Sequence, residues 1–325
     1  MKHRTFLKLA LAGLASLAGL NTAYAQQSYP SRPISIVVPY SPGGTVDALA
    51  RRLGEALRKQ INATVVIENK PGAGASLGAD FVSKSAPDGH TILIASTSPL
   101  TIFPHITKTA YKPLEDLAPI ASVAISPAAL VATKASNAKN FQDLLAAAKA
   151  RPDSVRYGTP GVGTIAHLAM EVLSDKTGTR MLHIPYKGNT QALTDAIGGS
   201  FELLVANVDV LLPHVQSATF RPLAVMAPKR LEAWPNVPTM AELGHPEAQY
   251  YSNFGMFVPA KTPAAVLNIL KTEIRKAIST PEYAEFLAKS SMQPGFGTGP
   301  EFARQIKAEY ELNGKVIKAA QIKYE

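Results

Sequence analysis

Short β-branched runs alternate with longer amphipathic segments along this chain, and this alternation restricts the possible folds more than any other feature. Residues 34–40, 64–69 and 90–96 are rich in Val and Ile, and two amphipathic segments separate them. In the first of these segments a Leu or Ile recurs at every fourth residue from Leu49 to Ile61, as on one face of a helix. Strand, helix, strand, helix, strand is typical of a parallel sheet flanked by helices.

The same pattern restarts further along and predicts a second α/β unit over residues 125–248. The chain then ends in helical patterns that have no partner strands of their own in sequence, and we expect these helices to cover the first sheet. The predicted organisation is a discontinuous lobe 1, residues 26–124 plus 249–325, and a lobe 2, residues 125–248. Two lobes joined by two crossings leave a cleft that can hinge.

Residues 1–25 have the features of a cleavable secretory signal peptide. A basic start precedes an apolar stretch at 9–20 and a small-x-small ending at Ala23 to Ala25, and that stretch is too short to span a bilayer. The chain has no cysteine, which excludes disulfides, thiolate nucleophiles and a lipid-anchored leader. We therefore expect a soluble periplasmic protein that begins at Gln26.

The chain carries a small net positive charge that is spread along the sequence. Removal of the leader takes away Lys2, Arg4 and Lys8 and no acid, so the formal net charge falls from +9 to +6. The basic residues are scattered rather than interleaved with aromatic ones, so nucleic-acid binding is not expected. A diffuse positive field helps to gather anionic small molecules.

Three glycine-rich turns, at residues 39–47, 71–78 and 158–166, each follow a predicted strand and precede a predicted helix. Exposed N–H groups at a helix start carry partial positive charge, and glycine lets an anion approach the backbone closely. For the turn after Pro71, a tight connection and a ligand contact remain equal alternatives. The first and third turns lie in different predicted lobes, so they could hold one anion from both sides.

Two polar residues near these turns have structural as well as functional interpretations. Asp47 in a first helical turn is favoured by the helix dipole without any ligand. His167 can equally be a helix residue packed under its turn rather than a direct ligand contact. Both alternatives stay open at the level of sequence.

Known catalytic and cofactor patterns are incomplete. The stretch Gly161-Val-Gly-Thr-Ile-Ala166 matches the dinucleotide fingerprint, but no acid ends the following strand at Ile184 to Lys187. Ser41 is not in a G-x-S-x-G elbow, and the histidines lack metal-binding spacing. We therefore expect no enzyme activity, no cofactor and no metal.

The motifs taken together resemble the substrate-binding proteins of tripartite tricarboxylate transporters, also called the Bug or TctC family. The resemblance covers essentially the whole mature chain. Its markers are Tyr29-Pro-Ser-Arg-Pro-Ile, Val38-Pro-Tyr-Ser-Pro-Gly-Gly-Thr-Val-Asp47, Val66-Ile-Glu-Asn-Lys-Pro-Gly-Ala-Gly, Pro87-Asp-Gly-His-Thr-Ile-Leu, Gly158-Thr-Pro-Gly-Val-Gly-Thr-Ile-Ala-His-Leu168, Ile184-Pro-Tyr-Lys-Gly188 and Pro235-Asn-Val-Pro-Thr-Met-Ala-Glu-Leu-Gly244.

The resemblance implies a periplasmic-binding-protein-like Venus flytrap, in which two α/β lobes close on a di- or tricarboxylate, an aromatic acid or an amino acid. It implies a carboxylate held mainly by backbone amides and water from the first and third turns, with more variable side chains tuning the ligand. With His167 added from the third turn, the predicted ligand-binding residues are Tyr40, Ser41, Pro42, Gly43, Gly44, Asp47, Ser96, Thr97, Ser98, Thr159, Gly161, Val162, Gly163, Thr164, His167, Tyr186, Lys187, Asn207 and Asp209.

The segment Asn207-Val-Asp209 departs from the Phe-Asp or Asp-Asn pairing that the family often has, so either residue could face the ligand. The implied partners are the small carboxylate and the membrane subunits of a tripartite tricarboxylate-type transporter, and a monomer suits the hinge. A ligand sensor for a signalling receptor would use the same fold and pocket. An exported enzyme using the cleft is the third alternative.

Overall fold

The computed structural model describes residues 29–322, of which 32–322 belong to one compact unit. The predicted signal peptide lies outside the described residues. Strands of the described part are hydrogen-bonded in the order β2-β1-β3-β9-β4-β7-β5-β6, and β8 and β10 both pair with β4. Their bounds are β1 Ile34–Val38, β2 Val65–Asn69, β3 Thr91–Ser96, β4 Leu117–Ala132, β5 Arg156–Thr159, β6 Leu182–Pro185, β7 Leu203–Asn207, β8 Arg221–Met226, β9 Tyr251–Pro259 and β10 Gln293–Gly297.

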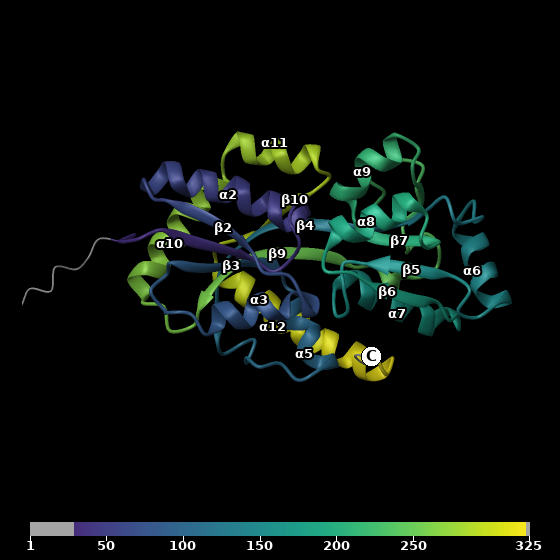
Figure 1. Ribbon diagram of the computed structural model, residues 1–325, viewed down its shortest axis with the longest axis horizontal. Helices are drawn as coiled ribbons and strands as arrows, with labels where there is room; N and C mark the ends of the chain where they lie inside the picture. Colours follow the sequence, from purple (N-terminus) through teal and green to yellow (C-terminus); the bar gives the residue numbers. More distant parts are fainter. Residues whose placement is uncertain (1–28, 323–325) are drawn as a thin grey trace, which may run out of the picture. The chain divides into compact units, whose positions relative to one another are not determined.

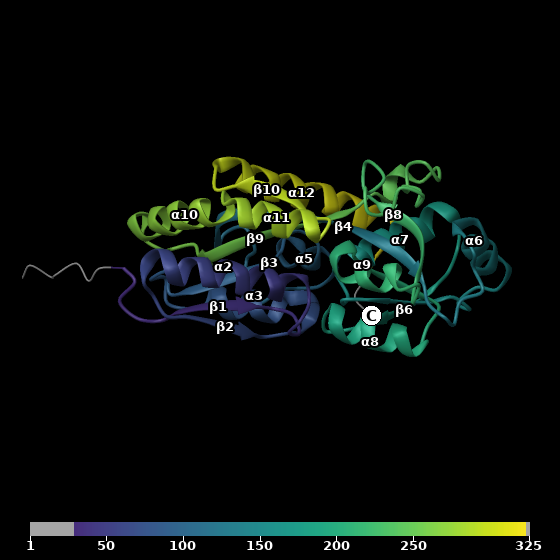
Figure 2. The same cartoon turned by 90° about the horizontal axis from the view of Figure 1, so that it is seen from above.

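Helices lie on both sides of these strands (Figures 1 and 2). Their bounds are α2 Thr45–Ile61, α3 Ser76–Ser83, α4 Ser98–Thr101, α5 Phe103–Ile106, α6 Phe141–Ala150, α7 Ile165–Thr177, α8 Asn189–Gly198, α9 Val208–Gln216, α10 Ala264–Ile278, α11 Pro281–Lys289 and α12 Pro300–Ala319, with short 3-10 turns at Ala73–Ala75 and Pro246–Ala248.

Strand β4 belongs to both lobes. It is 16 residues long, and its first part pairs with β9 and β10 while its last part pairs with β7 and β8. All four pairings are antiparallel, whereas β1 to β3 and β5 to β7 pair in parallel within their own lobes. The two lobes are therefore joined through continuous β-structure.

The first lobe is a layered α/β unit. Alternate residues of a strand face opposite sides of its sheet. Val37, Leu93 and Ala95 pack with residues of α3 and α12 in one cluster. On the other face Gly54 of α2 lies close to Ile36. Helices α2 and α10 contact each other, so the C-terminal helices cover this lobe as expected (Figure 1).

The second lobe repeats the arrangement around the end of β4. Leu130 packs with residues of α6 and α7, whereas its neighbours Ala129 and Val131 pack with residues of α8 and α9. The elements α6 to α9 gather around β5, β6 and β7 in Figure 1. Both faces of this sheet are thus covered, which explains its nearly continuous apolar strands.

The predicted two-lobed α/β fold is confirmed. Strand β9 is buried at most of its positions, yet Ser252, Asn253 and Gly255 interrupt its apolar pattern. Strand β4 starts at Leu117, before the predicted start of the second α/β unit at residue 125. The division into residues 26–124 plus 249–325 and residues 125–248 stays a prediction. No helix within residues 29–322 combines the length and apolar character that a membrane span requires.

The packing of α12 on β9 leads to a stability prediction. A Cβ added at Gly255 would overlap the ring of Phe302, whose side chain is almost fully buried. We expect Gly255→Ala to lower the free energy of unfolding by about 1–3 kcal/mol in urea titration, as overpacked core sites do. Gly198→Ala is the control, because its added Cβ would meet only Ser200 Oγ at 3.8 Å. Equal stability of the two variants would contradict this packing.

Candidate ligand-binding site

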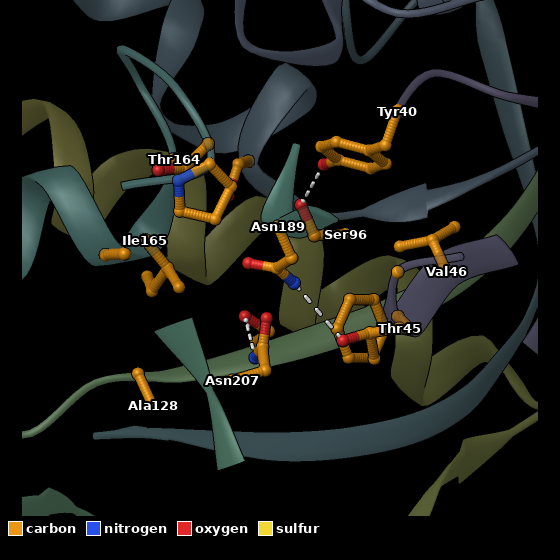
Figure 3. A pocket seen from close by; sticks show the side chains of 15 residues that line it. Tyr40, Thr45, Val46, Ser96, Ala128, Thr164, Ile165, Asn189 and Asn207 are labelled. Carbon is orange, nitrogen blue, oxygen red and sulfur yellow. Dashed lines mark hydrogen bonds between the residues drawn. The ribbon is translucent and has the colours of Figure 1, made fainter. Parts of the chain in front are cut away.

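A small cavity lies between the two lobes, where the N-termini of α2 and α7 meet (Figure 3). It measures about 30 Å³, about two to three times the 10–15 Å³ that one water needs on the same scale. None of the described residues that line it is charged. These residues are Tyr40, Gly44, Thr45, Val46, Ser96, Ser98, Ala128, Pro160, Thr164, Ile165, Ala166, Asn189, Asn207, Ser252 and Phe254.

The turn before α2 is fixed by the carboxylate of Asp47. This carboxylate accepts hydrogen bonds from Gly43 N at 3.1 Å, Arg51 Nε at 2.8 Å and Asn69 Nδ2 at 3.0 Å. Burial raises the pKa of Asp47, but the bonds from Arg51, Asn69 and Gly43 outweigh burial and leave the pKa below its usual value. Gly43 has φ +82°, which favours glycine. Asp47 is thus placed to hold the turn and does not line the cavity.

The first residues of α2 follow this turn. Thr45 and Val46 are the first two residues of the helix, and both line the cavity. No carbonyl of the helix can accept a hydrogen bond from these N–H groups. Together with the positive end of the helix dipole they can bind an anion.

The turn before α7 is built in the same way, but its glycine amides are already used. Gly161 N donates to Thr159 Oγ1 at 3.2 Å, and Gly163 N donates to His167 Nδ1 at 3.3 Å. The side chain of Thr164 caps the helix by accepting from His167 N. The first two residues of α7, Ile165 and Ala166, line the cavity. The donors available to a ligand are therefore those of the first helical residues rather than of the glycines.

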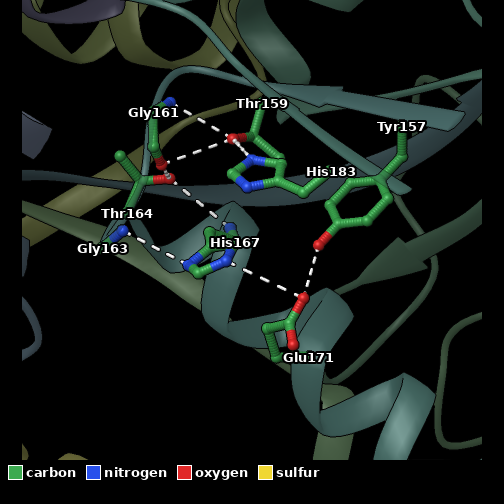
Figure 4. A network of polar contacts seen from close by, with 8 residues as sticks. All are labelled: Tyr157, Thr159, Gly161, Gly163, Thr164, His167, Glu171 and His183. Carbon is green, nitrogen blue, oxygen red and sulfur yellow. Dashed lines mark hydrogen bonds and ion pairs between the residues drawn. The ribbon is translucent and has the colours of Figure 1, made fainter. Parts of the chain in front are cut away.

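A stack of three rings packs beside the third turn, with His167 and Tyr157 buried and His183 half-buried (Figure 4). The rings of His167 and His183 stack with centroids 4.3 Å apart, and His183 stacks on Tyr157 at 4.9 Å. His183 Nε2 lies 2.7 Å from Thr159 Oγ1, and the Tyr157 hydroxyl donates to Glu171 at 2.6 Å. Burial lowers the pKa of His167 to about 4 and that of His183 to about 3. Both imidazoles are neutral near pH 7, so His167 can accept from Gly163.

Hydroxyl and amide side chains complete the cavity wall. The Tyr40 hydroxyl lies 2.8 Å from Ser96 Oγ, and burial raises the pKa of Tyr40 to about 12. Asn207 Nδ2 donates to Ser252 Oγ at 2.9 Å. These groups stay uncharged near pH 7, so the wall offers hydrogen bonds without formal charge.

Direct contacts join the lobes beside the cavity. The backbone N and the hydroxyl of Ser41 both donate to Lys187 O, at 3.2 and 3.1 Å. Thr190 Oγ1 donates to Pro42 O at 2.7 Å. The molecule is therefore in a closed arrangement, with the start of α8 against the first turn.

The structure brings only some of the expected site residues to the cavity wall. Those that line it are Tyr40, Gly44, Ser96, Ser98, Thr164 and Asn207. Ser41, Pro42 and Lys187 make the contacts between the lobes, and Gly43, Asp47, Thr159, Gly161, Gly163 and His167 hold the two turns. Thr97, Val162, Tyr186 and Asp209 do not line the cavity, and a ligand role for any of these residues stays a prediction.

Two of those outer side chains have partners elsewhere. The Tyr186 hydroxyl donates to Asp195 Oδ2 at 2.7 Å, and Asp209 Oδ1 accepts from Ser126 Oγ at 3.1 Å. Conversely, several residues that line the cavity were not predicted from the sequence. Val46, Ile165 and Ala166 could have been found as first-turn helix residues, whereas Ala128, Asn189, Ser252 and Phe254 carry no local signal.

Fold and site together define a two-lobed solute-binding protein. The family described as "Tripartite tricarboxylate transporter family receptor" matches residues 49–322. Protein BugT of Bordetella pertussis is 35% identical over 307 residues, which cover 93% of each chain. This chain belongs to the tripartite tricarboxylate transporter receptor family, the Bug or TctC group.

Solved structures agree with this assignment. The periplasmic binding protein BugD is 28% identical with a TM-score of 0.85, over 91% of this chain and 100% of that one. An R. palustris protein solved with adipate is 30% identical with a TM-score of 0.86, over 91% of this chain and 99% of that one. The predicted family is confirmed.

The neutral imidazole of His167 leads to a prediction about how the free energy of unfolding depends on pH. Its pKa of about 4 lies below the usual value of about 6.5, so the unfolded chain takes up this proton first as the pH falls. The stabilisation is complete above about pH 6.5 and is lost as the pH falls toward 4. We expect His167→Asn, whose amide oxygen can still accept from Gly163, to lose less unfolding free energy than wild type between about pH 7 and pH 5. Identical losses in urea titrations of the two proteins would exclude this contribution.

Proposed function

We propose that this chain is a periplasmic solute-binding protein that captures a small carboxylate between its lobes and delivers it to a membrane transporter of the tripartite tricarboxylate type. The observation that carries the proposal is the pair of helix N-termini, α2 and α7, that reach one cavity from the two lobes. Helix N-termini of this kind bind anions through N–H groups and the helix dipole. Family membership and the adipate found in a related structure support the ligand class.

Hydrogen bonds without a cationic side chain can supply the required affinity. A net gain of about 1.5–3 kcal/mol is typical for each bond to a charged group. Micromolar binding requires about 8 kcal/mol. Four to six such bonds from the amides of both helices and the wall hydroxyls reach that value after part of the gain is lost to ordering. Exclusion of water from the closed cavity strengthens each bond.

The lobes in this proposal are residues 26–124 plus 249–325 and residues 125–248. Strands β4 and β9 act as the hinge, and the working unit is a monomer. Export to the periplasm through removal of residues 1–25 belongs to the same proposal. No nucleic acid, metal or cofactor takes part.

Two other functions use the same fold. A ligand sensor would bind the same carboxylate and report to a signalling receptor, whereas an exported enzyme would convert it. The absence of His, Asp and Glu from the described cavity wall favours binding over turnover. Deletion of the gene should abolish uptake of the bound carboxylate if transport is correct, and should leave uptake intact if sensing is correct.

Calorimetry over a panel of small mono-, di- and tricarboxylates tests the binding function directly. We expect at least one carboxylate to bind with micromolar or better affinity. The same mixtures followed by proton NMR should show no conversion. Turnover of any panel member would contradict the binding-only function.

Substitution of Ile165 by proline isolates one backbone donor. Proline is well tolerated at the first position of a helix, and Thr164 before it already has the extended backbone that proline requires. We expect Ile165→Pro to weaken carboxylate binding about tenfold or more while the unfolding midpoint changes little, because one charge-assisted hydrogen bond is lost. Ile165→Ala removes the same side chain and keeps the N–H. Equal affinities of the two variants would remove this amide from the site.

A further inference from the structure

One amide oxygen in the cavity wall has no hydrogen-bond partner. Asn189 is the first residue of α8, and its Nδ2 donates to Thr45 Oγ1 at 3.4 Å, which links the two lobes. Its Oδ1 is buried and unpartnered among the described residues, and the residue lines the cavity (Figure 3). A buried acceptor without a donor costs about 1–3 kcal/mol. Such a group in a ligand site indicates a donor on the ligand.

The orientation of this amide is set by a chain of hydrogen bonds that begins at Asp209. The Asp209 carboxylate is held by the side chains of Ser126, at 3.1 Å, and Thr45. An ionised carboxylate only accepts, and a hydroxyl has one proton to donate. The Thr45 hydroxyl therefore gives its proton to Asp209 and can only accept from Asn189. Asn189 must then turn its NH₂ group toward Thr45 and its oxygen into the cavity.

The remaining wall also favours a ligand with its own donor. The described residues that line the cavity include no Lys or Arg, so a second carboxylate would meet no cationic side chain. The small volume leaves room for few atoms beyond one carboxylate. An ammonium or hydroxyl group beside that carboxylate would satisfy Asn189 Oδ1 without requiring further space.

We propose that the ligand is a small carboxylate bearing a hydroxyl or ammonium group. Asn189 is the residue that selects for this donor. Thr45 and Asp209 are positioning residues that orient the amide of Asn189. The inference rests on the proposed carboxylate-binding function and narrows its ligand class. It assigns the donor to the ligand and the acceptor to the protein.

Two matched sets of probes test the proposal. The first set shares one four-carbon skeleton: succinate has no added donor, malate has a hydroxyl group and aspartate has an ammonium group. Propionate, lactate and alanine form the same series on a three-carbon skeleton. Calorimetry near pH 8 keeps Asp209 ionised, because burial raises the pKa of this carboxyl only to about 6. We expect a donor-bearing member of one set to bind about tenfold or more tightly than its parent acid.

Three substitutions should remove this preference. Asn189→Leu deletes the acceptor, Thr45→Val frees the amide to rotate, and Asp209→Asn lets the residue donate to Thr45. We expect the ratio of dissociation constants, parent acid over donor-bearing acid, to fall about tenfold toward one in each variant. A merely structural role would weaken both acids equally and leave the ratio unchanged. Thr194→Val is the control, because its hydroxyl donates to Thr190 O within α8 and does not reach the cavity.

The outcomes separate this inference from the function on which it rests. Parent acids that bind as tightly as their donor-bearing counterparts would overturn the donor preference and leave carboxylate binding intact. An unchanged ratio in Asn189→Leu would overturn the assignment to Asn189. Binding of none of the six probes would overturn the inference, and binding of no carboxylate in the wider panel would contradict the proposed function as well.

Discussion

The first-turn N–H groups of an α-helix have no acceptor within their own helix, and this constraint governs the cleft. In each lobe one helix, α2 or α7, presents these groups at the same cavity. Helix N-termini left buried without partners are unfavourable, so an anion that binds them relieves a cost already present in the fold. The strands, the glycine turns and the supporting side chains all serve to hold these two helix ends opposite each other.

In both lobes the helix end is held by the same hydrogen-bond geometry, but the side chains that provide it differ in chemistry. In both, the third residue of the helix accepts a hydrogen bond from the glycine four residues earlier, Gly43 to Asp47 and Gly163 to His167. Asp47 does so as a carboxylate paired with Arg51, whereas His167 does so as a neutral ring packed on His183. The chain thus keeps both turns rigid, and in neither lobe is the supporting side chain part of the cavity wall.

Much of the fold was predictable because it is encoded in local periodicity, such as the leucines of α2 and the β-branched residues of β1. Strand β9 was not, because Ser252 and Asn253 are buried through side-chain hydrogen bonds that only distant residues supply. The glycine turns were correctly located, but the amides of Gly43, Gly161 and Gly163 have partners within their turns. The cavity wall also includes the first helical residues Thr45, Val46, Ile165 and Ala166. Asn189 reaches the cavity only through contact between the lobes, which no local pattern encodes.

The long strand β4 also has a mechanical meaning. Because β4 runs through both sheets and is hydrogen-bonded to β9 up to Pro127, a two-stranded ribbon lies at the junction of the lobes. Such a ribbon bends across its thin direction far more readily than within its plane. Relative motion would therefore be an elastic flexure about nearly one axis, which returns the helix ends of α2 and α7 to the same alignment on every cycle.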